Sequence, residues 1–217
     1  MLKAVVFDLD GLIFNTEDVF IYAIERLLAP FGFQYEEGVR RQMMGQQAHV
    51  SIGILKDHYR LKGSNEEIRQ QVEKEFLSAL PDILQLMPGF DGLIKSIKCN
   101  GILTAVCTSS TADYAEKLLN KFGYLDSFAF IIGSEHVENG KPMPDCYLMA
   151  CEQLQLLPEE VMVLEDSENG CRAAIDANTF AVAVPGRHNE GHTYHGAALI
   201  ADTLGDPEIL KALNISE

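Results

Sequence analysis

Short apolar runs alternate along this chain with segments whose apolar residues recur at helical spacing. Six runs have the length and the Val, Ile, Phe and Ala content of buried strands: 4–7, 102–107, 128–132, 161–164, 180–184 and, less strongly, 197–201. They are continuous rather than alternating, which is typical of a sheet covered on both faces. Helical periodicity follows at 89–98, 111–122, 144–156 and 168–177. This order predicts an α/β fold with a Rossmann-like parallel sheet.

One long interval interrupts this alternation. About 100 residues separate Asp8, at the end of the first run, from Thr108, after the second, whereas a strand–helix–strand unit needs only about 30. The extra residues contain no good strand but show helical runs at 17–28, 38–44, 50–59 and 66–80. We therefore expect an α/β core of residues 1–15 and 88–217 and an inserted, all-helical domain of residues 16–87.

Composition narrows the class of protein and its partners. The 217 residues are 47% hydrophobic and 23% charged, as in soluble globular proteins, and 17 basic against 32 acidic residues give a net charge of −15. Such a charge disfavours nucleic acid and anionic lipid as partners. The chain has five cysteines and no CxxC pair, and no apolar run approaches the roughly 20 residues of a membrane span. Both observations favour a cytoplasmic protein. We expect a monomer or weak dimer.

Acidic residues follow the first and fourth apolar runs. Asp8 and Asp10 alternate with Leu9, so both carboxylates lie on one side of an extended chain. Two close carboxylates repel each other unless a cation lies between them, and oxygen ligands suit Mg²⁺. Glu165 and Asp166 form a second acidic pair after the run at 161–164. Beside Asp8 and Asp10, this pair would complete a carboxylate metal site.

Two further segments carry groups that suit an anion. Thr108-Ser109-Ser110 leads from a strand into a helix, where hydroxyl groups and free amides either bind an anion or simply cap the helix. Lys141 stands between a glycine and a proline, which suits one rigidly held positive charge. Lys141 follows Thr108 by 33 residues and Asp166 follows Lys141 by 25, about one strand–helix unit each. All these groups therefore belong at the carboxyl ends of strands, on one edge of one sheet.

In this order, the four segments resemble the motifs of the haloacid dehalogenase-like (HAD) hydrolase superfamily. Asp8-Leu9-Asp10-Gly11, with Thr16-Glu17, resembles the first motif, and Thr108, Lys141 and Glu165-Asp166 resemble the next three. The insertion resembles the helical cap of the subgroup that includes β-phosphoglucomutase and many small-molecule phosphatases. The resemblance covers essentially the whole chain and implies an enzyme.

The resemblance also implies roles for individual residues. Asp8 would attack phosphorus to form an aspartyl-phosphate, and Asp10 would act as general acid and base. Thr108, the amide of Ser109 and Lys141 would hold the phosphate. Mg²⁺ would be bound by Asp8, the carbonyl of Asp10 and Asp166, with Glu165 assisting. The substrate-contacting residues of the cap and hinge would be Glu17, Gly45, Gln46 and His49.

Three functions are compatible with these motifs. The first is a Mg²⁺-dependent phosphatase of a small phosphorylated metabolite, such as a sugar or nucleoside phosphate. The second is a phosphosugar mutase, but this chain has Ala48 where β-phosphoglucomutase carries an arginine. The third is a non-catalytic phosphate-binding module, against which the intact acids argue. Asp10 argues against a dehalogenase, which does not need it.

Two local features depart from the motifs or lie outside them. The family usually has an acid where this chain has Asn15, at the first hinge. His188, His192 and His195 recur at helical spacing, but Gly186, Gly191 and Gly196 interrupt them. We interpret the three histidines as part of an exposed polar loop at the rim of the site rather than as a metal site.

Overall fold

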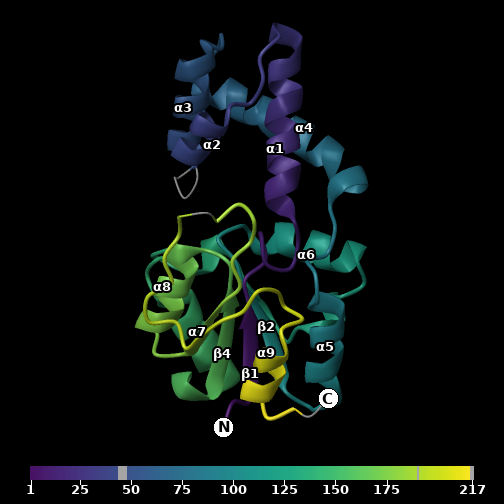
Figure 1. Cartoon of the computed structure of the whole chain (residues 1–217), viewed down its shortest axis with the longest axis vertical. Helices are drawn as coiled ribbons and strands as arrows, with labels where there is room; N and C mark the ends of the chain where they lie inside the picture. Colours follow the sequence, from purple (N-terminus) through teal and green to yellow (C-terminus); the bar gives the residue numbers. More distant parts are fainter. Residues whose placement is uncertain (44–47, 190, 216–217) are drawn as a thin grey trace. The chain divides into compact units, whose positions relative to one another are not determined.

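The computed structural model describes residues 1–43, 48–189 and 191–215. The chain divides into two compact units, one of Met1–Phe14 with Leu86–Glu217 and one of Asn15–Gln85 (Figure 1). The division differs from the predicted domain boundaries by one residue at the first hinge and by two at the second. In the described part of the chain, no helix combines the length and the apolar character needed to cross a bilayer.

The larger unit is built on a six-stranded sheet. Its strands are β1 (Ala4–Phe7), β2 (Leu103–Cys107), β3 (Ile131–Ile132), β4 (Val161–Glu165), β5 (Phe180–Ala183) and β6 (Leu199–Ile200). Their order is β3-β2-β1-β4-β5-β6 and every pairing is parallel, which confirms the predicted Rossmann-like sheet. Phe7 of central β1 is in register with Val106 and Leu164, so β1, β2 and β4 end at the same edge.

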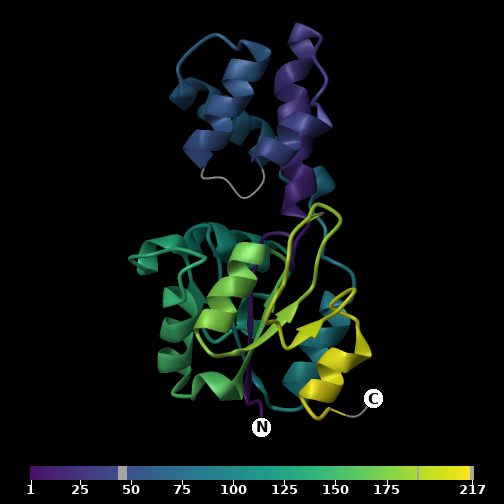
Figure 2. The same ribbon diagram turned by 60° about the vertical axis from the view of Figure 1, so that its left-hand side comes forward.

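Helices cover both faces of the sheet, as the continuous apolar strands predict. They are α5 (Phe90–Cys99), α6 (Ala112–Lys121), α7 (Asp145–Leu154), α8 (Glu168–Asp176) and α9 (Pro207–Ala212). Figure 2 shows α7 and α8 on one side of the sheet and α5 with α9 on the other. On the α7–α8 side, Val6 and Val163 pack in one cluster with Tyr147 and Ala174. On the other side, Phe7 packs edge-to-face against Phe90 at 5.9 Å between ring centroids.

The two edge strands are shorter than predicted. The apolar runs at 128–132 and 197–201 leave only two residues each in β3 and β6. An edge strand is bonded on one side only, so its pairing ends where the single neighbour turns away. Ala129 and Ala198 still donate their amides to Thr104 and Ala181, just outside the regular ladders.

The smaller unit is the predicted helical insertion. It contains α1 (Thr16–Leu28), α2 (Glu37–Met43), α3 (Ala48–Tyr59) and α4 (Asn65–Ile83). Ser64 caps α4 in a capping box with Glu67, which satisfies the amides at the helix start. Apolar side chains of all four helices form one core, which includes Ile24, Val39, Leu55, Ile68 and Val72.

Asn15 joins the two chain ends of this helical unit. Its amide N–H donates to the carbonyl of Gln85 at 3.1 Å, and its side-chain Oδ1 accepts from the amide of Gln85 at 2.6 Å. Its Nδ2 donates to the carbonyl of Ile83 and to Asp18. An aspartate could not make the last two contacts, because its carboxylate has no N–H. Asn15 therefore links the two ends of the helical unit by hydrogen bonds.

Candidate active site

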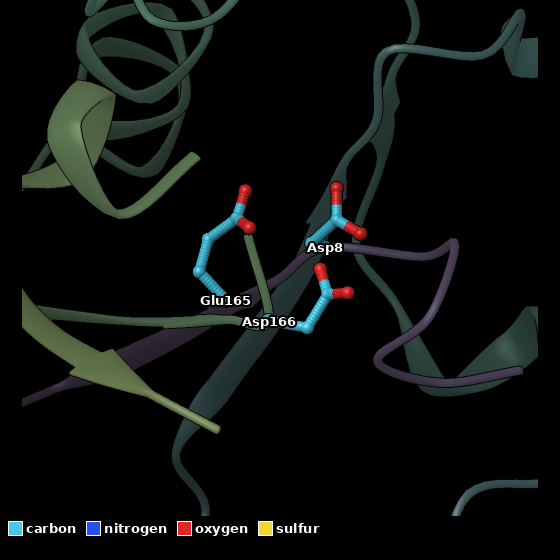
Figure 3. A group of neighbouring side chains, drawn as sticks. All are labelled: Asp8, Glu165 and Asp166. Atoms are coloured by element: carbon cyan, nitrogen blue, oxygen red, sulfur yellow. The ribbon is translucent and has the colours of Figure 1, made fainter. Parts of the chain in front are cut away.

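Three buried carboxylates gather where β1 and β4 end. Asp8 follows β1, Glu165 is the last residue of β4 and Asp166 follows it (Figure 3). One ligand atom from each lies within 4.8 Å of the others. The carboxylates lie close together because β1 and β4 are in register, and the amide of Asp8 donates to the carbonyl of Leu164 at 3.0 Å. As whole residues, the three are only 6%, 1% and 5% exposed, so their carboxylates are poorly hydrated.

Two glycines make room for these acids. A Cβ on Gly11 would lie 2.4 Å from Oδ2 of Asp166, and Gly11 has a φ of +83°, which other residues rarely adopt. A Cβ on Gly170 would lie 1.8 Å from Oε1 of Glu165. The sharp turn after Asp10 and the start of α8 thus both depend on the absence of a side chain.

Lys141 neutralises part of this negative charge. Its Nζ lies 2.5 Å from Oδ1 of Asp8, 2.6 Å from Oε1 of Glu165 and 2.9 Å from the carbonyl of Cys107. Burial alone would lower the pKa of Lys141, but Asp8 and Glu165 raise it well above its usual value. Lys141 is therefore a fixed ammonium group at neutral pH.

Glu165 is held on both of its oxygens. Oε1 accepts from Lys141 and from the hydroxyl of Tyr147 at 2.6 Å, while Oε2 accepts from the amide and hydroxyl of Ser167 at 3.3 and 3.1 Å. Burial, and next the charge of Glu165, raise the pKa of Tyr147 well above its usual value, so the phenol stays a donor. Glu165 thus fixes the position of Lys141 as well as contributing a carboxylate.

Asp10 lies beside the end of β2. The hydroxyls of Thr108 and Ser110 donate to its Oδ2 at 3.2 and 2.7 Å, and the amide of Ser110 donates to the Thr108 hydroxyl at 3.0 Å. Burial raises the pKa of Tyr114 above its usual value, and the charge of Asp10 raises it further. The structure therefore brings Thr108 to Asp10 and adds Ser110 and Tyr114, which the sequence reasoning missed. Ser110 could have been found as the third residue of the Thr-Ser-Ser segment.

The remaining predicted residues are less closely connected. Ser109 is exposed between Thr108 and Ser110, and Glu17 lies in the first turn of α1. Gly45 and Gln46 lie outside the described residues, and His49 belongs to α3 without a described side chain. The three histidines at 188, 192 and 195 lie in the loop between β5 and β6 and form no helix, in agreement with the loop interpretation.

The donor set fits a hard divalent cation. Asp8, Glu165 and Asp166 offer only oxygen atoms, as Mg²⁺ prefers. Burial raises the pKa of Asp8 well above its usual value; Lys141 lowers it, while Glu165 and Asp10 raise it further. One ammonium group therefore does not balance the buried carboxylates, and a divalent cation would offset the excess negative charge.

Known proteins resemble this chain in both sequence and fold. A model of the family described as "Haloacid dehalogenase-like hydrolase" matches residues 5–184. A "Phosphorylated carbohydrates phosphatase" of Thermotoga maritima is 31% identical over 81% of this chain and 82% of its own length. A "Probable pseudouridine-5'-phosphatase" of Drosophila melanogaster is 34% identical over 90% and 87%.

A solved structure agrees with these relatives. CbbY from Rhodobacter sphaeroides, in complex with phosphate, superimposes with a TM-score of 0.79 at 28% identity, over 94% of this chain and 96% of that one. The family match covers most of the chain, and the two relatives align over 82% and 87% of their own length. With the strand-end acids, this confirms the resemblance: the chain belongs to the haloacid dehalogenase-like hydrolases.

Proposed function

We propose that this protein is a Mg²⁺-dependent phosphatase of a small phosphorylated metabolite and works through an aspartyl-phosphate. The observation that carries the proposal is the environment of Asp8. Its carboxylate is buried, lies 2.5 Å from the ammonium of Lys141 and is close to Asp166. A second acid, Asp10, is held two residues further on by Thr108 and Ser110. Nucleophile and proton donor thus come from one turn of the chain.

In the first half-reaction, Asp8 attacks phosphorus in line with the leaving alkoxide. A carboxylate oxygen forms the new P–O bond, and the bond to the leaving oxygen breaks. Asp10 donates its proton to that oxygen, so the product leaves as an alcohol. In the second half-reaction, Asp10 takes a proton from water as the water attacks the aspartyl-phosphate. Phosphate leaves, and Asp8 is regenerated.

The charge that develops on the phosphoryl oxygens needs fixed donors. We assign this role to Lys141, the hydroxyl of Thr108 and the amide of Ser109. Thr108 and Ser109 directly follow β2, and Lys141 lies in the loop before α7. Such donors act mainly by position and charge, as phosphoryl transfer requires. Lys141 suits this role because Glu165 holds its ammonium group at 2.6 Å, and the hydroxyl of Tyr147 in turn holds Glu165 at 2.6 Å.

The cation would be held by Asp8, Asp166 and the main-chain carbonyl of Asp10, with Glu165 assisting. When bound, Mg²⁺ supplies charge neutralisation between the carboxylates and the phosphoryl oxygens. Asp8 would then be ionised at neutral pH, as a nucleophile must be.

The substrate class rests on the relatives. Two of them are named as phosphatases, one of phosphorylated carbohydrates and one of pseudouridine 5'-phosphate. We propose that the helical unit acts as the cap domain and that Glu17, Gly45, Gln46 and His49 contact the substrate. We further propose that the enzyme is a cytoplasmic monomer or weak dimer.

A phosphate-release assay tests the proposal. Purified protein is assayed with p-nitrophenyl phosphate and a panel of sugar and nucleoside monophosphates, with and without Mg²⁺. Release that requires Mg²⁺ and disappears in Asp8→Asn supports the proposal, whereas full activity of that variant refutes the mechanism. Asp176→Asn, at the exposed end of α8, is the matched control and should retain activity.

Product analysis of the same reactions, together with a binding measurement, separates the alternatives. A phosphosugar mutase would interconvert β-glucose 1-phosphate and glucose 6-phosphate in the presence of a bisphosphate activator, with little release of phosphate. Tight binding of phosphomonoesters with no turnover on the whole panel would favour a binding module.

A further inference from the structure

The loop between β5 and β6, residues 184–198, lies against the metal-site acids of the same unit. The side-chain Nδ2 of Asn189 donates to Oδ2 of Asp166 at 3.3 Å. The hydroxyl of Tyr194 donates to the main-chain carbonyl of Asp166 at 2.6 Å. One residue of the loop therefore holds the Asp166 side chain, and another holds its backbone.

Further contacts attach this loop to the start of α8. The hydroxyl of Thr193 donates to Oε1 of Glu168 at 2.6 Å, and the amide of Glu168 donates to Nδ1 of His192 at 3.4 Å. Nδ2 of Asn189 also lies 3.3 Å from Nδ1 of His192. The position of Asn189 is therefore set by several bonds, and its contact with Asp166 is part of an ordered structure.

Glycines on two sides shape the space around the Asp166 carboxylate. Oδ2 of Asp166 packs against Gly11, where a Cβ would approach to 2.4 Å. Gly186 brings the loop close to the same turn: a Cβ there would lie 3.1 Å from Oδ1 of Asn189 and 4.0 Å from the carbonyl of Gly11. The oxygen that Asn189 holds is thus confined between the turn after Asp10 and the loop.

We propose that Asn189 is a positioning residue that orients the Asp166 carboxylate for the divalent cation. A hydrogen bond to one carboxylate oxygen fixes the rotation of the carboxylate group and so directs the other oxygen toward the cation. The inference rests on the proposed metal-dependent function and adds to it a residue outside the four motifs. In this role Asn189 acts through its hydrogen bond to Asp166 rather than as a metal ligand itself.

A metal-binding measurement tests this role without depending on turnover. Mn²⁺ is titrated into the substrate-free protein, and free Mn²⁺ is measured by its electron paramagnetic resonance signal. Loss of a hydrogen bond to a metal ligand typically weakens metal affinity about tenfold to a hundredfold. We expect at least about a tenfold loss in Asn189→Ala and in the similarly shaped Asn189→Leu. In phosphate release, both variants should need more Mg²⁺ for half-maximal rate, with a smaller change in kcat at saturating Mg²⁺.

Thr193→Val is the matched control. It removes the loop's bond to the Glu168 carboxylate but leaves the Asn189–Asp166 contact in place, and it should bind Mn²⁺ like the unaltered protein. Equal affinity in the Asn189 variants and the unaltered protein would overturn the inference while leaving the phosphatase proposal intact. Equal losses in Thr193→Val and Asn189→Ala would also overturn it, because general loosening of the loop would explain both. If the unaltered protein binds no divalent ion and releases phosphate without one, both proposals fail.

Discussion

The two units of this protein use charged residues in opposite ways. In the α/β unit, Lys141 pairs with Asp8 and Glu165, and the three side chains are 6%, 9% and 1% exposed. In the helical unit, Arg69 pairs with Glu66 and Glu73, and these side chains are 47%, 59% and 54% exposed. Distances are similar, at 2.5 and 2.6 Å for the first set and 2.8 and 3.0 Å for the second.

The two sets of ion pairs therefore differ in burial much more than in the distance between the charged groups. An exposed pair one helical turn apart gains little, because water and salt screen it. A buried pair must first lose its hydration, which often costs more free energy than the attraction returns. Nothing in folding alone requires three acids and one lysine at the end of a sheet. The proposed catalysis at an anionic phosphate gives these buried charges a role that folding does not.

The largest expected effect comes from Lys141→Ala. This variant leaves Asp8 and Glu165 buried without their cation, and breaking a buried pair in this way costs about 3–5 kcal/mol of unfolding free energy. Phosphate release should also be lost. Chemical denaturation measures the first effect and the phosphate assay the second. Lys117→Ala, which removes an exposed pair with Asp113 at 2.5 Å, is the control; similar losses in both variants would contradict the comparison.

Asp8→Asn should stabilise the metal-free protein while abolishing activity. The pKa of Asp8 is raised in the folded state, so the folded protein holds that proton more tightly than the unfolded chain does. The contribution of Asp8 to stability is therefore present in full below the pKa of the unfolded chain, about 4, and is lost as pH rises. The advantage of Asp8→Asn should be largest at neutral and higher pH and should vanish near pH 4.

Thermal unfolding of both proteins in chelator, across this pH range, measures the difference. Mg²⁺ should raise the unfolding temperature of the unaltered protein more than that of Asp8→Asn, because the variant lacks one of the proposed metal ligands. A variant that is less stable than the unaltered protein at neutral pH would show that the pair with Lys141 outweighs the cost of burial.

A smaller effect is expected from Ser110→Ala. The hydroxyl of Ser110 donates to Oδ2 of Asp10 at 2.7 Å and so helps to place the residue that we propose as the proton donor to the leaving group. Removal should lower kcat about tenfold for a sugar phosphate, or roughly 1.4 kcal/mol. The fall should be smaller for p-nitrophenyl phosphate, whose leaving group needs little protonation. An equal fall with both substrates would mean that Ser110 acts on phosphate binding rather than on Asp10.

The smallest effect is expected from Arg69→Ala in the helical unit. Its pairs with Glu66 and Glu73 are exposed, so the unfolding midpoint should move only slightly, and the shift should disappear at about 0.5 M salt. Denaturation at low and high salt measures this. A large loss of stability that does not depend on salt would show that Arg69 is structurally essential. It would also remove the contrast between the two units.

The sequence determined the parts of this protein that depend on local patterns. Continuous apolar runs specify strands buried on both faces, and the long interval after Asp8 specifies an insertion, because each signal lies within a short stretch of chain. Parallel strands share a carboxyl edge, which is why Asp8, Thr108, Glu165 and Asp166 could be assigned to one site before their contacts were known. The helix α9 and the true ends of the edge strands were missed, since their signals are weak.

Tertiary structure decided which of these groups touch, and how. Lys141 contacts Asp8 across 133 residues of sequence, and Asn189 contacts Asp166 across 23. Spacing predicts the sheet edge at which Lys141 lies but not which carboxylates it contacts, and the contact of Asn189 has no spacing signal. Each contact arises only when separate loops meet at the sheet edge. The same holds for the burial that raises the pKa of Asp8: the sequence specifies the carboxyl group, but only the folded chain removes its water.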